Sequence, residues 1–307
     1  MICWCSGSRA APHPIRCVTN ATRPAMSDPD PLPLPPKALP IELTQVGAVG
    51  PHAVLIELSR KLHPRTVVLR DLPAAVNADG ANGLTRAPAT RARQLGLHVP
   101  AGAASVPLAA YHPADWGPRA LWQPAGRGAL GLDAPESGGR SPTDAWGWLL
   151  VDGQPYVQPA GSAAPGAYMS TTALYDPAYE ATDPRRWFDS AALPGWVLPA
   201  HDLRRYGVDL GDLALIEHGP YKTWAQAFDA GNPGRMVELS IAACAALGIP
   251  DCARRGGVSG GVNITILPGS RIWLRNSEGR PVPGTAQEID RAGRAAAAAV
   301  GLRTGME

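Results

Sequence analysis

The chain has 307 residues, of which 33 are Pro and 34 are Gly, and its formal net charge is +2. This length allows a sizeable core in one or two domains, while the heavy use of Pro and Gly argues against a helical bundle and favours turns and short strands. No apolar run of about 18 residues occurs, which excludes a membrane-spanning helix. The seven His and five Cys lack metal-ligand spacing, so we expect no metal and no cofactor.

The start of the chain predicts little fixed structure. Residues 1–40 contain nine Pro and, apart from Trp4, no aromatic residue. Such a segment cannot bury enough apolar surface to offset the entropy of ordering, so we expect a disordered leader. The leader also lacks the basic region, apolar core and cleavage site of a signal peptide, which leaves the localisation unknown.

The next segment, 41–105, is expected to form short strands and loops ahead of the main domain. The runs 53–58 and 66–69 are rich in Val, Leu and Ile, as strands are. Residues 80–110 show little periodicity and predict a loop.

The main domain is expected over 106–274, because all aromatic residues except Trp4 lie between Tyr111 and Trp273. An apolar run, a DGQ turn and a second run predict a hairpin over 146–158. Further strand-like runs are 168–174, 196–199, 213–216 and 224–228. The Gly-rich run 256–261 predicts a flexible connection. In the tail, 275–307, the sequence Thr285-Ala-Gln-Glu288 predicts a capping box and an Ala-rich helix ending near Val300.

Two carboxylates are the candidate catalytic residues of this sequence. Asp229 ends a strand-like run, and Glu238 follows nine positions later, in the first turn of a helix expected over 237–247. A turn loop between them lets the two side chains face each other across a cleft, as acid/base hydrolysis of a glycosidic bond requires. The residues alone leave a simpler interpretation open, in which Asp229 caps a loop and Glu238 is only a charge at a helix start.

Other polar residues fit a groove or an ordinary surface. Tyr168, Thr171 and Thr172 are candidate substrate-binding residues, because sugars stack on aromatic rings and bond to hydroxyls; a half-buried strand explains them equally. Asp183 and Asp189 flank Arg185 and Arg186 and predict surface ion pairs.

Charge is unevenly distributed along the chain. Residues 111–270 hold 16 acidic and 11 basic residues, a net of −5, whereas residues 1–110 hold 6 acidic and 11 basic residues, a net of +5. An acidic domain would attract a cationic substrate and repel nucleic acid. Ordinary solubility charge is the alternative.

Eight segments between residues 110 and 270 resemble one family. They are AYHP, WGWLLVDGQPYVQ, APGAYMSTTAL, DPRRWFDS, LPGWVLP, LGDLALI, the FDAG…VELSIAACAALGI block and LPGS. In this order they resemble the bacterial branch of glycoside hydrolase family 75, the fungal-type chitosanases. The chain departs from the family's usual pattern at Val237, where the family has Gly, and in the residues that follow Asp229.

The resemblance implies endo-hydrolysis of the β-1,4 linkages of chitosan, a glucosamine polymer, by an inverting pair formed by Asp229 and Glu238. The residues alone leave open which of the two is the acid; with the resemblance we take Glu238 as the acid and Asp229 as the base. The implied partner is a polysaccharide, with no nucleic acid and no membrane span. We expect a monomer, and the substrate implies secretion.

The same block is similar to double-psi β-barrels. This likeness implies a mainly β fold with short helices, built on a six-stranded double-psi-like catalytic domain. That fold hosts binders and lyases as well as hydrolases. The alternatives are therefore a non-catalytic carbohydrate- or peptidoglycan-binding barrel and a peptidoglycan lytic enzyme.

Overall fold

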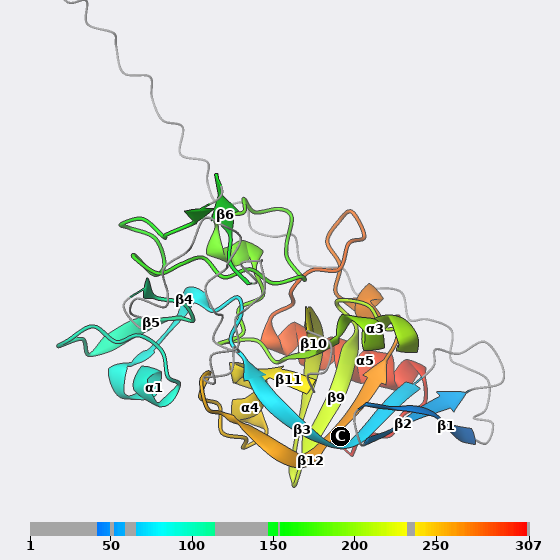
Figure 1. Ribbon diagram of the computed structural model, residues 1–307. Coiled ribbons are helices and arrows are strands. Elements are labelled where there is room, and N and C mark those ends of the chain that lie inside the picture. The colour runs from blue at the N-terminus through cyan, green and yellow to red at the C-terminus, as the bar shows by residue number, and fades with distance from the viewer. Residues whose placement is uncertain are drawn as a thin grey trace, which may run out of the picture. The chain divides into compact units, whose positions relative to one another are not determined.

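The computed structural model describes residues 42–49, 52–58, 66–113, 147–152, 154–231 and 237–305. This part of the chain is mainly β, with short helices, and contains a closed six-stranded barrel (Figure 1). The Pro-rich leader 1–40 lies outside the described residues.

The barrel closes because its first and last strands pair with each other. Its strands, in spatial order, are β3 (Thr66–Asn77), β11 (Val237–Ser240), β8 (Gly195–Pro199), β10 (Tyr221–Gly231), β9 (Leu213–His218) and β12 (Gly257–Leu267), which pairs back to β3. The β3–β11 and β8–β10 pairs are parallel, and the other pairs are antiparallel. Closure leaves the barrel without an unpaired edge around its circumference.

Smaller elements surround the barrel. β1 (Glu42–Val49) and β2 (His52–Leu58) form a hairpin that pairs with β3, and β4 (Asn82–Pro88) pairs with β5 (Ser105–Ala109). β6 (Leu150–Val151) and β7 (Gln154–Pro155) form a short hairpin. The helices are α1 (Ala89–Gln94), α3 (Ala200–Tyr206), α4 (Ile241–Ala246) and α5 (Ala286–Ala299), with 3₁₀ turns η2 (Pro184–Arg186) and η3 (Ser270–Trp273).

Two apolar clusters pack on the two faces of the barrel sheet. One includes Leu69 and Ile264, with alternate residues of the neighbouring strands. The other includes Val197, Trp224 and Phe228, and packs against α5. β9 and β10 thus contribute to both clusters, which explains their nearly continuous apolar runs, because a strand covered on both faces needs no polar alternation.

Several expected elements are confirmed. The hairpin turns at Asp152, whose φ of 50° is the left-handed conformation that Asp tolerates in a tight turn. The runs 196–199, 213–216 and 224–228 lie in β8, β9 and β10. α5 begins with the expected capping box between Thr285 and Glu288.

The expected helix over 237–247 is wrong in its first four residues, which form β11. Ser240 decides the boundary: its Oγ accepts the Ala243 N–H, so it is the N-cap of α4 and the helix cannot begin before it. Glu238 therefore lies on a strand and not in a helical first turn.

Other expectations also change. The loop expected over 80–110 contains β4, α1 and β5, and the Gly-rich run 256–261 is largely the start of β12. Residues 168–174 contribute isolated bridges and no strand. β3 is a barrel strand, although it lies in the segment 41–105 that we expected to precede the main domain.

Helix α5 approaches the barrel at Gly293. A Cβ atom built on Gly293 would lie 2.2 Å from Cδ2 of Trp224, a fully buried ring of β10. The absence of a side chain at this position therefore lets the helix lie directly on the strand that carries Asp229.

We expect Gly293→Ala to lower the free energy of unfolding by about 1–3 kcal/mol, as overpacking of a core does. In an unobstructed helix interior the same change would raise stability by about 1 kcal/mol. Urea unfolding of this variant measures the effect, with exposed Ala298→Gly as the control for helix propensity. A more stable Gly293→Ala protein would contradict the close packing.

Candidate functional site

Strand β8 separates the two predicted carboxylates. Val197 of β8 pairs with Asp229 of β10 on one side and with Glu238 of β11 on the other. Two interstrand spacings put the Cα atoms of the carboxylates about 10 Å apart. Paired residues on adjacent strands point to the same face, so the structure brings Asp229 and Glu238 together on one side of the barrel wall.

A third carboxylate, Asp79, joins them. It follows the end of β3, where Ala75 pairs with Glu238. Asp79, Asp229 and Glu238 lie close enough for their charges to interact: Glu238 acts on both Asp residues, and Asp79 acts on Asp229. Sequence reasoning missed Asp79, because it stands in a turn-rich run, AVNADGANG, whose position beside β11 follows only from the barrel topology.

Asp79 is held by two hydroxyl groups. The Tyr111 hydroxyl donates to Oδ1 of Asp79 at 2.5 Å, and Oγ of Ser170 lies 3.3 Å from the same oxygen. Asn77 connects Asp79 to Glu238: its Oδ1 accepts the Asp79 N–H at 2.8 Å, and its Nδ2 donates to Oε2 of Glu238 at 3.0 Å. The orientation of all these groups is thus fixed by direct hydrogen bonds.

The segment that contains Ser170 runs along the other carboxylate as well. Ser170 is anchored by Asn82, whose amide bonds both its N–H and its carbonyl. Further along, the Ala173 N–H bonds to the Asp229 carboxylate, and the Leu174 N–H donates to the Phe228 carbonyl. Oδ1 of Asp229 also accepts the Ala230 N–H at 2.8 Å. Segment 170–174 therefore forms one wall of the site.

Burial determines the protonation of the two aspartates. Desolvation, with smaller effects from the neighbouring carboxylates, raises the pKa of Asp229 to about 8. Desolvation likewise raises the pKa of Asp79 to about 7, against the opposing effect of the Tyr111 hydroxyl. The cluster thus holds protons near neutral pH, which a solvated pair of aspartates would not do.

The predicted substrate-binding residues have different surroundings. The Tyr168 ring stacks on Trp148, with centroids 4.7 Å apart, and remains half-buried. Thr171 is also half-buried, and its N–H donates to the Gly147 carbonyl. Thr172 is buried, and its hydroxyl donates to the Leu174 carbonyl and accepts the Phe188 N–H, so it holds the loop together.

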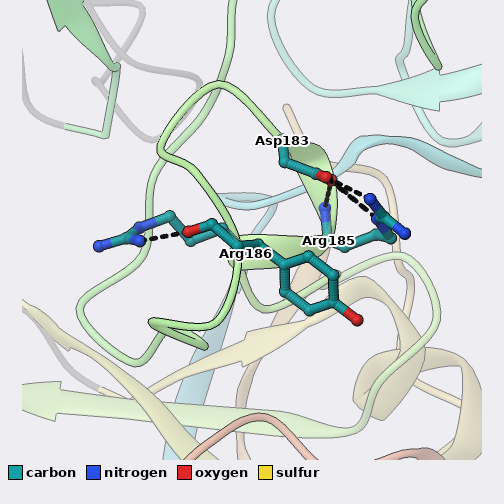
Figure 2. A network of polar contacts seen from close by, with 4 residues as sticks. Asp183, Arg185 and Arg186 are labelled. Atoms are coloured by element: carbon teal, nitrogen blue, oxygen red, sulfur yellow. Dashed lines mark hydrogen bonds and ion pairs between the residues drawn. The ribbon is translucent and has the colours of Figure 1, made fainter. Parts of the chain in front are cut away.

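Arginine–aromatic contacts hold the loop beyond this segment. Arg186 lies over the Tyr175 ring, 4.3 Å from its centroid, and donates to the Tyr179 carbonyl. Figure 2 shows Arg185 paired with Asp183 on one side and Arg186 extending to the other. The expected surface ion pair of Asp183 is confirmed. Asp189, by contrast, is buried and accepts from the Thr85 hydroxyl, because the loop folds over it.

Within the described ranges, no group of three or more His, Cys, Asp or Glu is arranged to hold a metal ion. Cys244 and Cys252 are free thiols, and Cys244 is a core residue. No helix of the described residues has the length and apolar character needed to cross a membrane. Neither a protein-family model nor a curated protein sequence matches this chain.

The raised pKa values predict how stability depends on pH. Between the pKa of an unfolded aspartate, near 4, and the folded values of about 7 and about 8, the folded state binds more protons than the unfolded state. The contribution of these two groups to stability is therefore complete below about pH 4 and is lost as the pH rises to about 8.

We expect the double variant Asp79→Asn, Asp229→Asn to melt at a less pH-dependent temperature over this window than the wild type. Melting curves at pH 4.5 to 8 test this, with the exposed Asp290→Asn as control. If the double variant and the wild type showed the same pH dependence, the two carboxyl groups would have ordinary pKa values.

Proposed function

We propose that this protein is a glycoside hydrolase that cleaves β-1,4 linkages at internal positions of the chitosan polymer. The observation that supports this proposal is the pairing of Val197 with both Asp229 and Glu238. An inverting hydrolase holds its two carboxyl groups about 6.5–9.5 Å apart, with a water between one of them and the sugar. A pair of carboxylates on the two strands that flank β8 is compatible with such a separation.

In this mechanism Asp229 is the general acid. Burial raises its pKa to about 8, so it retains a proton at neutral pH and donates it to the leaving glycosidic oxygen. This assignment reverses the one taken from the family resemblance. It rests on the desolvation of Asp229, which keeps this carboxyl group protonated.

Glu238 is the general base. The Asn77 amide donates to Oε2 of Glu238 at 3.0 Å and fixes the orientation of this carboxyl group. The carboxylate takes a proton from a water that attacks the anomeric carbon on the face opposite the leaving group. The C–O bond to the leaving sugar breaks as the new C–O bond forms, and the configuration at the anomeric carbon inverts.

We also propose a double-psi barrel and a cationic substrate. Two parallel pairs in a closed six-stranded barrel support a double-psi arrangement. The net charge of −5 over residues 111–270 supports a cationic substrate. We propose a secreted monomer, with half-buried Tyr168 and Thr171 beside the sugar.

We expect Asp229→Asn and Glu238→Gln each to reduce chitosan hydrolysis by about 10²–10⁴-fold or more, because each removes a proton-transfer group. Reducing-end release measures the loss, and circular dichroism verifies folding. The matched controls are Asp290→Asn and Glu278→Gln, whose carboxylates form exposed ion pairs with Arg294 and Arg280. Near-normal turnover by either folded site variant would remove that residue from the mechanism.

Substrate choice separates this proposal from the alternatives. We expect reducing ends from chitosan and few from chitin or peptidoglycan. Binding of glucosamine oligomers to the Glu238→Gln protein should weaken as salt rises from about 50 to 500 mM, because screening shortens the reach of the acidic domain. Preferential cleavage of peptidoglycan would favour a lytic enzyme, and binding without cleavage of any polymer would favour a carbohydrate-binding barrel.

A further inference from the structure

The site contains one carboxylate more than hydrolysis needs. Asp229 and Glu238 supply an acid and a base, yet Asp79 lies with them and acts electrostatically on Asp229. Placing a third carboxylate in a desolvated cluster is costly unless other groups stabilise it. The role of Asp79 therefore depends on the groups that hold it.

Those groups are unusually well fixed. Tyr111 is 1% exposed, and its hydroxyl donates to Oδ1 of Asp79 at 2.5 Å. Its backbone carbonyl accepts the Tyr168 N–H, and the Trp148 ring packs at 62° to the Tyr111 ring, with centroids 5.5 Å apart. The tyrosine thus has little freedom to turn away from Asp79.

Ser170 adds a second hydroxyl at the same oxygen. Its Oγ accepts the Gly80 N–H at 2.9 Å, which aims the hydroxyl hydrogen toward Oδ1 of Asp79, 3.3 Å away. The backbone of Gly147 also approaches Asp79 closely, since a Cβ atom built on Gly147 would lie 2.7 Å from Oδ1 of Asp79. Two hydroxyl donors on one carboxylate oxygen favour the ionised form of that carboxylate.

From this geometry, and on the basis of the proposed hydrolase function, we infer that Asp79 is a positioning residue: held as a carboxylate by Tyr111 and Ser170, it keeps the catalytic proton on Asp229. The negative charge of Asp79 makes ionisation of its neighbour costly, so the proton stays on the residue that must donate it. The hydroxyl donors decide which of the two aspartates is ionised first.

The electrostatics of the cluster agree with this order. The Asp79 carboxyl group is the largest charged influence that raises the pKa of Asp229, and the Tyr111 hydroxyl is the largest influence that lowers the pKa of Asp79. Glu238 faces both from β11 and raises the pKa of each. Burial raises the pKa of both aspartates, and hydroxyl donors oppose this rise at Asp79.

The test is a carbon-13 NMR titration of the aspartate carboxyl groups in the full chain. We expect Asp79→Asn to lower the pKa of Asp229 by at least about one unit, a tenfold loss in proton affinity. We expect Tyr111→Phe to raise the pKa of Asp79 and to lower that of Asp229. The control is Tyr206→Phe, which removes another buried tyrosine hydroxyl and should leave both values unchanged. Among the described residues this hydroxyl has no hydrogen-bond partner.

The pH profile of chitosan cleavage gives a second readout, in which the alkaline limb should move to lower pH in both site variants. An unchanged Asp229 pKa in folded Asp79→Asn and Tyr111→Phe proteins would overturn the inference. The titration decides this even if the protein cleaves no polysaccharide. Conversely, a shifted pKa together with an absence of cleavage would uphold the coupling of the carboxyl groups and refute the hydrolase.

Discussion

The backbone pairing of β8 with both β10 and β11 fixes the spacing of the candidate site. Because Val197 lies opposite both Asp229 and Glu238, the backbone positions of these two residues cannot separate without breaking a strand pair. The apolar cluster that contains Val197, Trp224 and Phe228 supports this part of the wall, and α5 covers it through the close approach at Gly293. The relative position of these two residues therefore depends on strand pairing.

Closure of the barrel brings the third carboxylate to the same place. β3 must pair with β11 to complete the circuit, and the turn after β3 then carries Asp79 to the cluster. Segment 170–174 adds Ser170 and the Ala173 N–H, and the Tyr111 hydroxyl comes from the residues after β5. Desolvation by these layers raises the pKa of both aspartates, so the packing that encloses the site also determines its protonation.

Local patterns in the sequence predicted the strands with strong apolar runs, the hairpin and the capped C-terminal helix, because each depends on neighbouring residues. They failed where tertiary pairing decides the outcome. The sequence predicts Val237–Ser240 as the start of a helix, yet these residues pair with β3 and β8. The Gly-rich start of β12 looked flexible, and Asp79 looked like a turn residue, because their partners are distant in sequence. Asp229 and Glu238 were predicted as a pair from their spacing together with the family resemblance. Strand β8 brings them to one face of the barrel wall, and their catalytic role stays a prediction.

The most direct measurement is the anomeric configuration of the first products, followed by proton NMR during cleavage of a glucosamine oligomer. If Asp229 and Glu238, on the two strands that flank β8, act as an inverting pair, the new reducing ends appear first as the α-anomer and equilibrate later. Reducing ends that appear first as the β-anomer would require a covalent intermediate and more closely spaced carboxylates, and would contradict the roles given to Asp229 and Glu238.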